Sequence, residues 1–502
     1  MTQLKKYLLH ISLTLFCLSL VSSCSGLKEQ NHKFEPAALP TTNGIWSELN
    51  FKHDRSYFLP LNNHFEALKW RLRALDSAES SIDLQIFLWN NDHAGKLLAN
   101  SLVLAADRGV KIRLLIDDTF TIEKDQGLSN IHKHPNIDIR IYNPFKRRYN
   151  SFGMRYLMNI TEFSRIDHRM HNKVLIVDNH VVILGGRNLG DEYFGLHAET
   201  NFRDMELLAN GNISPFLSTI FSIYWANPWS FPLEKIIKND PEKIKPVTPP
   251  VSPFFPLNEN HAQRITAWKR FKSLATQADY SVLYDLPVDA NTENRTDDNF
   301  TLDIYKLISE AKKRVDIVSP YFIPTQELDE AIFEAEGRGV EVRILTNSLQ
   351  STNHTIAHSF YRKHMRKYVE SGADLYEYRA WARDRNLFMF APVEDKSLAL
   401  HAKMILIDDD LSLIGSANLD PRSLNINSEL GILLKSKTLS RQLRKLLDID
   451  FHLRNSWKVE INQEGNLIWR GHDKTLHQQP RNSRLQLFES WFLGLLPVES
   501  KI

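Results

Sequence analysis

Short runs rich in apolar residues recur along the chain and alternate with longer segments of helical periodicity. The runs at 110–117, 136–144 and 174–177 have the length of buried strands and are flanked by Gly, Asp, Asn or Pro. The segment 93–109 places apolar residues at every third or fourth position, as an amphipathic helix does. Helices that alternate with buried strands predict a layered α/β fold.

The same pattern occurs twice. AADRGVKIRLLIDD at 105–118 matches AEGRGVEVRILTNS at 335–348, which lies 230 residues later. HNKVLIVD at 171–178 matches HAKMILID at 401–408 with the same offset. A duplication that stays in register over this length predicts two α/β domains with a common fold.

Proline marks the boundary between the two copies. Six prolines fall within 241–256, so this stretch can neither continue a helix nor form a central strand. We therefore expect the following order: a leader at 1–24, a linker at 25–45, a first domain at 46–238, a Pro-rich linker at 239–260, a second domain at 261–470 and a C-terminal tail at 471–502. The apolar run LQLFESWFLGLLPV favours a tail that lies in a membrane interface, and a helix docked on the core is the alternative.

The leader has the pattern of an export signal. Lys5 and Lys6 precede an uncharged, mostly apolar stretch, and VSSC ends at Cys24. This tetrad resembles the lipobox of bacterial lipoproteins, which implies cleavage before Cys24 and lipid attachment to it. Ser25 after the cysteine implies outer-membrane sorting, with the body of the protein facing the periplasm. An uncleaved anchor helix is the alternative, although the roughly 20 residues that span a bilayer exceed this stretch.

Composition narrows the chemistry. The 62 Lys and Arg residues nearly balance the 60 Asp and Glu residues, and the net charge of +2 argues against a nucleic-acid partner. The two cysteines, Cys17 and Cys24, both lie in the leader, which excludes disulfides and cysteine-bound zinc from the remaining chain. Because the chain as a whole is nearly neutral, any anion-binding site must come from a local cluster of basic residues.

Each copy supplies one histidine, one lysine and one asparagine in the same order. These are His171, Lys173 and Asn188 in the first copy and His401, Lys403 and Asn418 in the second. A neutral imidazole can attack phosphorus, and a lysine and an amide can hold the non-bridging oxygens. In-line displacement also needs an acid beside the leaving group, which a second histidine can supply. The duplication therefore predicts one phosphodiester site at the interface of the two domains.

The pattern HxKxxxxD, followed after six residues by GSxN, resembles the motif of the phospholipase D superfamily. The second copy matches it at His401, Lys403, Asp408, Gly415, Ser416 and Asn418. The first copy matches it at His171, Lys173, Asp178, Gly185 and Asn188, with Gly186 in place of the serine. GGRN in the first copy resembles the cardiolipin synthase branch, and the resemblance covers nearly the whole chain after residue 45.

This resemblance implies an acidic partner for each histidine further along the chain, and Asp204 and Glu429 occupy the corresponding places. It also implies that no metal or cofactor takes part, and the lysine in each motif is a poor metal ligand. Asp178 and Asp408 belong to the motif, but their turn positions predict a supporting contact. By analogy His171 is the nucleophile and His401 the acid, and the reverse assignment stays open.

The implied activity is that of a phosphatidyltransferase that makes cardiolipin through a phosphatidyl-histidine, with phosphatidylglycerol and phosphatidylethanolamine as substrates. A hydrolytic phospholipase D is the alternative, because it differs only in whether water or a lipid hydroxyl resolves the intermediate. An exported nuclease is disfavoured by the near-neutral charge. A non-enzymatic lipoprotein scaffold is disfavoured because both motifs are intact.

One further segment mixes basic and apolar residues. Between 143 and 160, Lys146, Arg147, Arg148 and Arg155 alternate with Phe, Tyr and Met. Such mixing favours contact with an anionic membrane surface, where each basic group contributes on the order of 1 kcal/mol. A loop half buried at the domain interface is the alternative.

Overall fold

The computed structural model describes residues 27–36, 44–49, 51, 54–121, 125–237, 257, 259–287, 300–389 and 393–502. The predicted leader with Cys24 and nearly all of the Pro-rich linker lie outside the described residues. Among the helices that the structure does describe, none is long and apolar enough to cross a membrane.

The first half is built on a nine-stranded sheet with the order β10-β1-β8-β6-β5-β2-β3-β4-β9. Its strands are β1 (Tyr57–Leu61), β2 (Ser81–Ile86), β3 (Lys111–Asp117), β4 (Ile137–Tyr142), β5 (Val174–Val177), β6 (Val181–Gly185), β8 (Glu206–Asn210), β9 (Ser230–Pro232) and β10 (Thr276–Gln277). Its helices are α2 (Gly44–Leu49), α3 (His64–Asp76), α4 (His93–Asp107), α5 (Asp125–His132), α6 (Phe152–Met158), η1 (Ile160–Glu162), α7 (Phe163–Asp167), η2 (Asp191–Tyr193), α8 (Ile213–Trp225) and α9 (Leu233–Ile236).

The second half is built on a ten-stranded sheet with the order β11-β18-β17-β16-β12-β13-β14-β19-β20-β21. Its strands are β11 (Asp279–Tyr284), β12 (Arg314–Val318), β13 (Glu341–Asn347), β14 (Asp374–Tyr378), β16 (Met404–Ile407), β17 (Leu411–Gly415), β18 (Leu430–Lys435), β19 (Ser456–Ile461), β20 (Leu467–Arg470) and β21 (Thr475–Leu476). Its helices are α11 (Phe300–Ser309), α12 (Gln326–Gly337), α13 (Thr355–Ser371), η4 (Arg385–Leu387), α14 (Pro421–Asn425), α15 (Lys437–Phe451), α16 (Arg484–Leu493) and η5 (Glu499–Lys501).

The two sheets repeat one connectivity. The order β1-β8-β6-β5-β2-β3-β4-β9 corresponds strand for strand to β11-β18-β17-β16-β12-β13-β14-β19. In each sheet the strands β2-β3-β4 or β12-β13-β14 are parallel, and their neighbours on either side are antiparallel. The predicted pair of duplicated, layered α/β domains is therefore confirmed.

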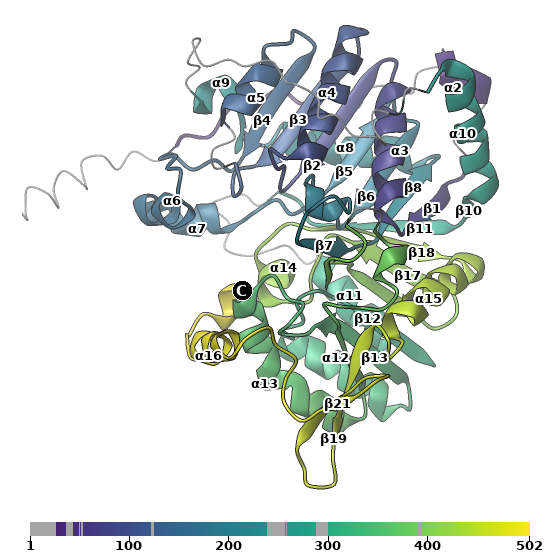
Figure 1. The fold of residues 1–502 in the computed structure, drawn as a ribbon. Helices are drawn as coiled ribbons and strands as arrows, with labels where there is room; N and C mark the ends of the chain where they lie inside the picture. Colours follow the sequence, from purple (N-terminus) through teal and green to yellow (C-terminus); the bar gives the residue numbers. More distant parts are fainter. Residues whose placement is uncertain are drawn as a thin grey trace, which may run out of the picture.

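The halves share one hydrophobic core. Each sheet has its own outer core, formed with α3 and α4 in the first half and with α11, α12 and α13 in the second. A third core contains residues of β5, β6, β16 and β17 together with α8 and α15, so it belongs to both halves. Figure 1 shows the halves stacked, with β7 (Thr200–Arg203), β11, β17 and β18 at the junction.

The structure corrects the predicted start of the second domain at residue 261. Helix α10 (His261–Leu274) packs on the first half, where Trp268 is fully buried against Trp46 and Trp70 and donates a 2.9 Å hydrogen bond to Ser77 Oγ. Strand β10 likewise extends the first sheet by pairing with β1. The second sheet begins with β11, and β21 extends it past the predicted end at residue 470.

The described part of the predicted linker at 25–45 does not stand away from the domain. The backbone N–H of Gln30 donates to Pro228 O at 2.9 Å, and the His32 ring contacts Ser230 O at 2.8 Å. Glu35 lies 3.8 Å from Arg113. Residues 27–36 therefore lie along the first half beside β9, because their polar groups find partners there.

Candidate active site

The two HxK segments lie at the junction, each directly before a central strand of its own sheet. Lys173 precedes β5 and Lys403 precedes β16. The backbone N–H of His171 donates to Ser428 O at 2.9 Å, and that of His401 donates to Arg203 O at 2.7 Å. Each motif is thus hydrogen-bonded to the other half of the chain.

The two acidic residues are exchanged between the halves. Both carboxylate oxygens of Glu429 lie 3.0 Å from His171 Nδ1, and Asp204 Oδ2 lies 2.6 Å from His401 Nδ1. Chain order alone would pair Asp204 with His171 and Glu429 with His401. The structure brings together all four residues, but each carboxylate serves the histidine of the opposite half.

Local pairing between the halves explains this exchange. Strand β7 pairs in parallel with β15 (Ser397–Leu400) of the second half, and both strands end directly before a site residue. Asp204 follows Arg203, and His401 follows Leu400, which is the register partner of Arg203. The Arg203 side chain is fully buried and bound to Asp450 of α15, with its shorter contact at 2.8 Å. This junction fixes Asp204 beside His401.

The electrostatics of the site follow from burial. Burial lowers the pKa of His171 to about 4 and that of His401 to about 3, and the lysine ammonium groups add to this effect while the carboxylates oppose it. Burial would raise the pKa of Asp204, but the contact with His401, together with the charges of Lys403 and Arg187, outweighs burial and holds that pKa at about 2. The resting site therefore contains neutral imidazoles beside ionised carboxylates. A carboxylate at Nδ1 fixes the proton there and leaves the lone pair on Nε2.

The two lysines bring positive charge to the same buried place. Lys173 and Lys403 are each 3% exposed. Each Nζ donates a 2.6 Å hydrogen bond to the backbone oxygen of the histidine in the same motif. Burial lowers the pKa of Lys403 to about 8, although Asp204 and Glu429 oppose this shift. The pKa of Lys173 is lowered in the same way. Two buried cations near two histidines form a site for an anion such as a phosphodiester.

The two asparagines differ. The Asn188 side-chain amide donates a hydrogen bond of 3.0 Å to Tyr193 Oη, and its oxygen accepts one of 3.2 Å from the backbone N–H of Leu88. Asn418 Oδ1 is buried and has no hydrogen-bond partner among the described residues. Asn188 therefore supports the surrounding chain, whereas Asn418 has a buried acceptor that remains unused among the described residues.

The motif aspartates brace the fold and do not contact the two histidines. The Asp178 carboxylate is buried and accepts hydrogen bonds from Trp46 Nε1 and from the backbone N–H groups of Glu79, Ser80 and Ser81, at 2.6 to 2.8 Å. Asp408 accepts from the equivalent N–H groups at the start of β12, the shortest at 2.7 Å. Each aspartate therefore ties a turn to the helix–strand corner of its own half.

Steric crowding explains why the first motif has glycine where the second has serine. A Cβ at Gly186 would lie 2.4 Å from Asp204 Oδ1, so the carboxylate occupies the space of a serine side chain. In the second half a serine does stand at the equivalent position, and Ser416 Oγ donates a hydrogen bond of 2.5 Å to Glu429 Oε2. The two histidine–carboxylate pairs are thus built differently although their backbones are equivalent.

Aromatic rings complete the walls of the site, and the sequence analysis did not identify them. The Phe87 ring meets His171 edge-on with centroids 4.7 Å apart, and Lys173 Nζ lies 5.1 Å from the Phe87 centroid. The rings of Tyr193 and Phe202 each lie 5.1 Å from the ring of His401. Phe87 directly follows β2, a central strand of the first sheet, and this position at the end of a buried apolar strand is the signal that could have found it.

Comparison with known proteins agrees with this architecture. The family model described as cardiolipin synthase, PLD-like domain, matches residues 72–207 and 304–450, one segment in each half. Cardiolipin synthase C of Escherichia coli (strain K12) is 30% identical over 453 residues, which cover 88% of this chain and 95% of that protein. A cardiolipin synthase of Clostridium perfringens (strain SM101 / Type A) is 24% identical and covers 84% of this chain and 77% of that protein.

A solved structure shows the same fold. The crystal structure of phosphatidylserine synthase from Haemophilus influenzae Rd KW20 superposes with a TM-score of 0.55 at 14% sequence identity. The match covers 81% of this chain and 89% of that chain. The family model supplies the finer assignment, because it matches more than half of the chain. This chain therefore belongs to the cardiolipin synthase family of phospholipase D-like enzymes.

Proposed function

We propose that the protein transfers a phosphatidyl group from one phospholipid to the hydroxyl of another and so makes cardiolipin. One observation carries this proposal: two buried histidines from the two halves, each with a carboxylate on Nδ1, lie with two lysines at one junction. Such a site offers a nucleophile, an acid and an anion-binding pair to a single phosphodiester. The names of the relatives that cover most of this chain support the lipid substrate.

In the proposed first step, His171 Nε2 attacks the phosphorus of the donor lipid. A P–N bond forms, the bond between phosphorus and the leaving alcohol breaks, and the His401 imidazolium gives its proton to the departing oxygen. With phosphatidylethanolamine as donor, the leaving group is ethanolamine. The arriving phosphodiester anion offsets the charge of Lys173 and Lys403, which raises the pKa of His401 and favours its protonated form.

In the second step, neutral His401 removes the proton from the free hydroxyl of phosphatidylglycerol. The resulting oxygen attacks phosphorus, the P–N bond breaks, and His171 returns to its neutral state. The overall change exchanges one alcohol for another on phosphorus, so neither an oxidant nor a metal is needed for balance. If water enters in place of the lipid hydroxyl, the product is phosphatidic acid and the enzyme is a hydrolase.

A lipid assay tests this proposal. Purified protein is incubated with labelled phosphatidylglycerol, with and without phosphatidylethanolamine, and the products are separated. Cardiolipin supports the transferase, whereas phosphatidic acid as the sole product identifies the hydrolase. His171→Ala should abolish either product, and full activity of that variant contradicts the mechanism.

A trapping experiment assigns the two histidines. With His401→Ala, the leaving group of an activated donor can still depart, and the phosphatidyl group should remain on His171. Mass spectrometry of peptides kept at neutral pH should then find the label on the fragment that contains His171. Label on His401 in the His171→Ala variant would give the reverse assignment.

We also propose that the protein is a lipoprotein of the outer membrane that faces the periplasm, anchored through Cys24. The lipobox-like VSSC and the following Ser25 support this location. Metabolic labelling with a radioactive fatty acid should mark the wild-type protein and leave Cys24→Ser unlabelled. Labelling that persists in Cys24→Ser refutes the anchor.

A further inference from the structure

An apolar surface projects from the first half beside the active site. It is formed by α6, η1 and α7, and its large exposed apolar side chains are Phe152, Met154, Leu157, Ile160 and Phe163, each between 41% and 64% exposed. Monomeric proteins rarely leave so many large apolar side chains together in water. We call this surface the α6–α7 face.

A second apolar surface lies on the C-terminal helix of the second half. The large apolar side chains exposed on α16 and the turn after it include Leu485, Phe488, Trp491, Phe492 and Leu495, each between 47% and 73% exposed. The helix is held to the body through polar contacts, among them Gln486 Nε2 donating to Leu349 O at 2.7 Å. Its apolar side chains are therefore the part that faces outward.

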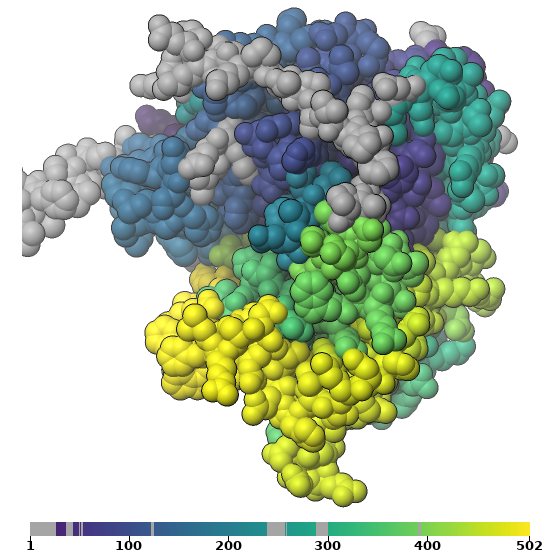
Figure 2. Space-filling view, viewed as in Figure 1, coloured from purple at the N-terminus to yellow at the C-terminus, as the bar shows by residue number. Residues whose placement is uncertain are grey.

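The two surfaces lie on one side of the molecule. Figure 1 shows α6, α7 and α16 on the same flank, and Figure 2 shows their segments projecting there in blue and yellow. The two halves are tied together on this flank: Asp167 at the end of α7 binds Arg422 of α14 at 2.6 Å and Lys501 of η5, which follows α16 in the chain, at 3.3 Å. The two halves thus contribute one discontinuous apolar face.

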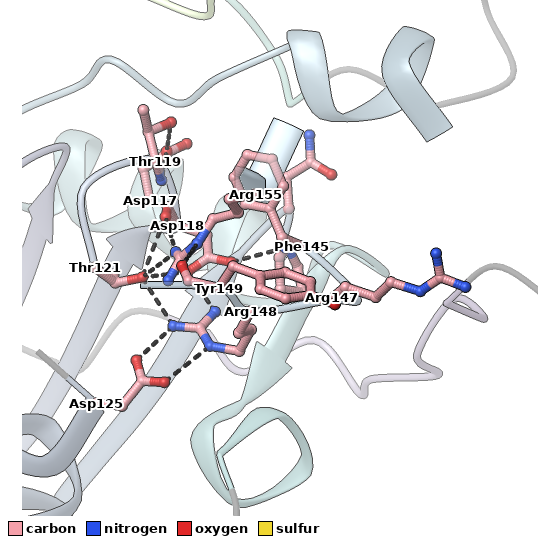
Figure 3. A network of polar contacts seen from close by, with 12 residues as sticks. Asp117, Asp118, Thr119, Thr121, Asp125, Phe145, Arg147, Arg148, Tyr149 and Arg155 are labelled. Atoms are coloured by element: carbon pink, nitrogen blue, oxygen red, sulfur yellow. Dashed lines mark hydrogen bonds and ion pairs between the residues drawn. The ribbon is translucent and has the colours of Figure 1, made fainter. Parts of the chain in front are cut away.

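Buried ion pairs hold the α6–α7 face in place. Arg148 binds both Asp118 and Asp125, and Arg155 donates to Asp118 O and to Thr121 Oγ1, each at 3.2 Å (Figure 3). Arg155 is 1% exposed. Two of the four basic residues expected at a membrane surface are thus internal anchors. The segment presents its apolar side chains because its charged ones are tied to the domain.

A row of aromatic rings connects this face with the active site. From His171 the row passes to Phe87 at 4.7 Å, then to Phe120 at 5.3 Å and to Phe152 of α6 at 6.1 Å between centroids. Exposure rises along the row, from 8% at His171 to 48% at Phe152. An apolar path therefore runs from the outer face to the proposed nucleophile.

We propose that the α6–α7 face and α16 dock together on a lipid bilayer, and that the Phe87–Phe120–Phe152 row guides the donor lipid to His171. This inference rests on the proposed function, because a phospholipid substrate must leave a bilayer with its acyl chains shielded. A bilayer fits better than a protein partner, because the two surfaces flank one site and are apolar at their outermost positions. A second copy of the chain is the competing occupant.

Site-specific probes test the docking directly. In the full chain with Cys17 and Cys24 replaced by serine, a polarity-sensitive fluorophore is attached to Leu157→Cys, Phe488→Cys or, as control, Leu104→Cys on α4. Vesicles of phosphatidylglycerol and phosphatidylethanolamine should shift the emission at 157 and 488 to the blue and leave that at 104 unchanged. Unchanged emission at 157 and 488, or an equal shift at 104, overturns the proposal. A shift that depends on protein concentration without vesicles identifies a second copy as the occupant.

Turnover separates failure of docking from failure of the proposed function. The combined variant Leu157→Glu/Phe488→Glu should lose at least tenfold in turnover of long-chain phosphatidylglycerol in vesicles. On a short-chain phosphatidylglycerol that is monomeric in water, the loss should be much smaller. Leu104→Glu is the matched control, because Leu104 is likewise about half exposed but lies on α4. Equal losses on both substrates contradict docking, whereas an inactive wild type with intact probe shifts contradicts only the transferase.

Discussion

Replacing Gly186 by serine tests whether the two histidine–carboxylate pairs are constrained as the structure indicates. Serine is the residue that the second copy carries at Ser416, so the change makes the two motifs alike. The added Cβ would lie 2.4 Å from Asp204 Oδ1, and real Cβ atoms are essentially never nearer than 3.0 Å to such an atom. Asp204 must therefore move, because Gly186 directly follows Gly185, which is held in the sheet by its pairing with Glu206.

The size of the effect follows from the hydrogen bond that this movement disturbs. The same carboxylate holds His401 Nδ1 at 2.6 Å. A hydrogen bond to a charged group contributes about 1.5–3 kcal/mol, and losing it from the transition state lowers the rate about 10- to 150-fold. We expect Gly186→Ser to reduce kcat by this factor, with little change in KM because both lysines stay in place.

A compensating change gives the decisive assay. Gly185 pairs with Glu206 in the first sheet and Gly415 pairs with Gly431 in the second, so Asp204 and Glu429 occupy equivalent positions. The double variant Gly186→Ser/Asp204→Glu reproduces the Ser416–Glu429 arrangement and should recover part of the lost rate. Ser416→Gly, which removes a donor without a clash, is the matched control and should cost only a few fold. Wild-type kcat in Gly186→Ser, with unchanged thermal unfolding, would refute the reasoning.

Three further predictions follow from the same geometry. Asp178→Asn should lower the free energy of unfolding by about 2–4 kcal/mol in denaturant titrations, since the buried anion accepts from several N–H groups; an unchanged midpoint contradicts the structural role. The reaction rate should fall as the pH rises through about 8, because Lys403 loses its proton there. The rate should also fall as the pH drops through about 4, because His171 gains a proton there. A pH–rate profile that stays flat up to pH 10 contradicts the role of Lys403. Arg203→Met should cost about 3–5 kcal/mol because it leaves Asp450 buried without its cation, and Arg203→Met/Asp450→Leu should recover stability; equal losses in both variants argue against the ion pair.

The sequence predicted the repeated fold because buried central strands leave a direct record. Runs such as 174–177 are apolar at every position because both faces of the strand are buried, and their recurrence at a fixed offset located both motifs. The sequence could not show on which of the two halves α10 packs. A helical pattern of apolar residues indicates which face of a helix is buried, but it does not indicate which part of the protein covers that face. Trp268 packs on Trp46, far away in the chain, and only the tertiary structure shows this contact.

The basic residues at 146–155 show a second limit. In the sequence they form a cluster that resembles a membrane-binding loop, but the partners of Arg148 lie 30 and 23 residues away, at Asp118 and Asp125. Charge alone does not reveal whether a cation faces lipid or an internal carboxylate. The apolar side chains of α6, η1 and α7, from Phe152 to Phe163, form the exposed face instead.

The exchange of carboxylates between the halves was also beyond the sequence, and it gives the duplication a chemical consequence. Each histidine takes its tautomer from the other half: His171 from Glu429 and His401 from Asp204. A separate first half would therefore keep His171 but lack both its carboxylate partner and the second histidine. The backbone hydrogen bonds from His171 N–H to Ser428 O and from His401 N–H to Arg203 O also tie each histidine to the opposite half. The junction is thus part of the site itself, so changes that loosen it should reduce catalysis before they unfold either half.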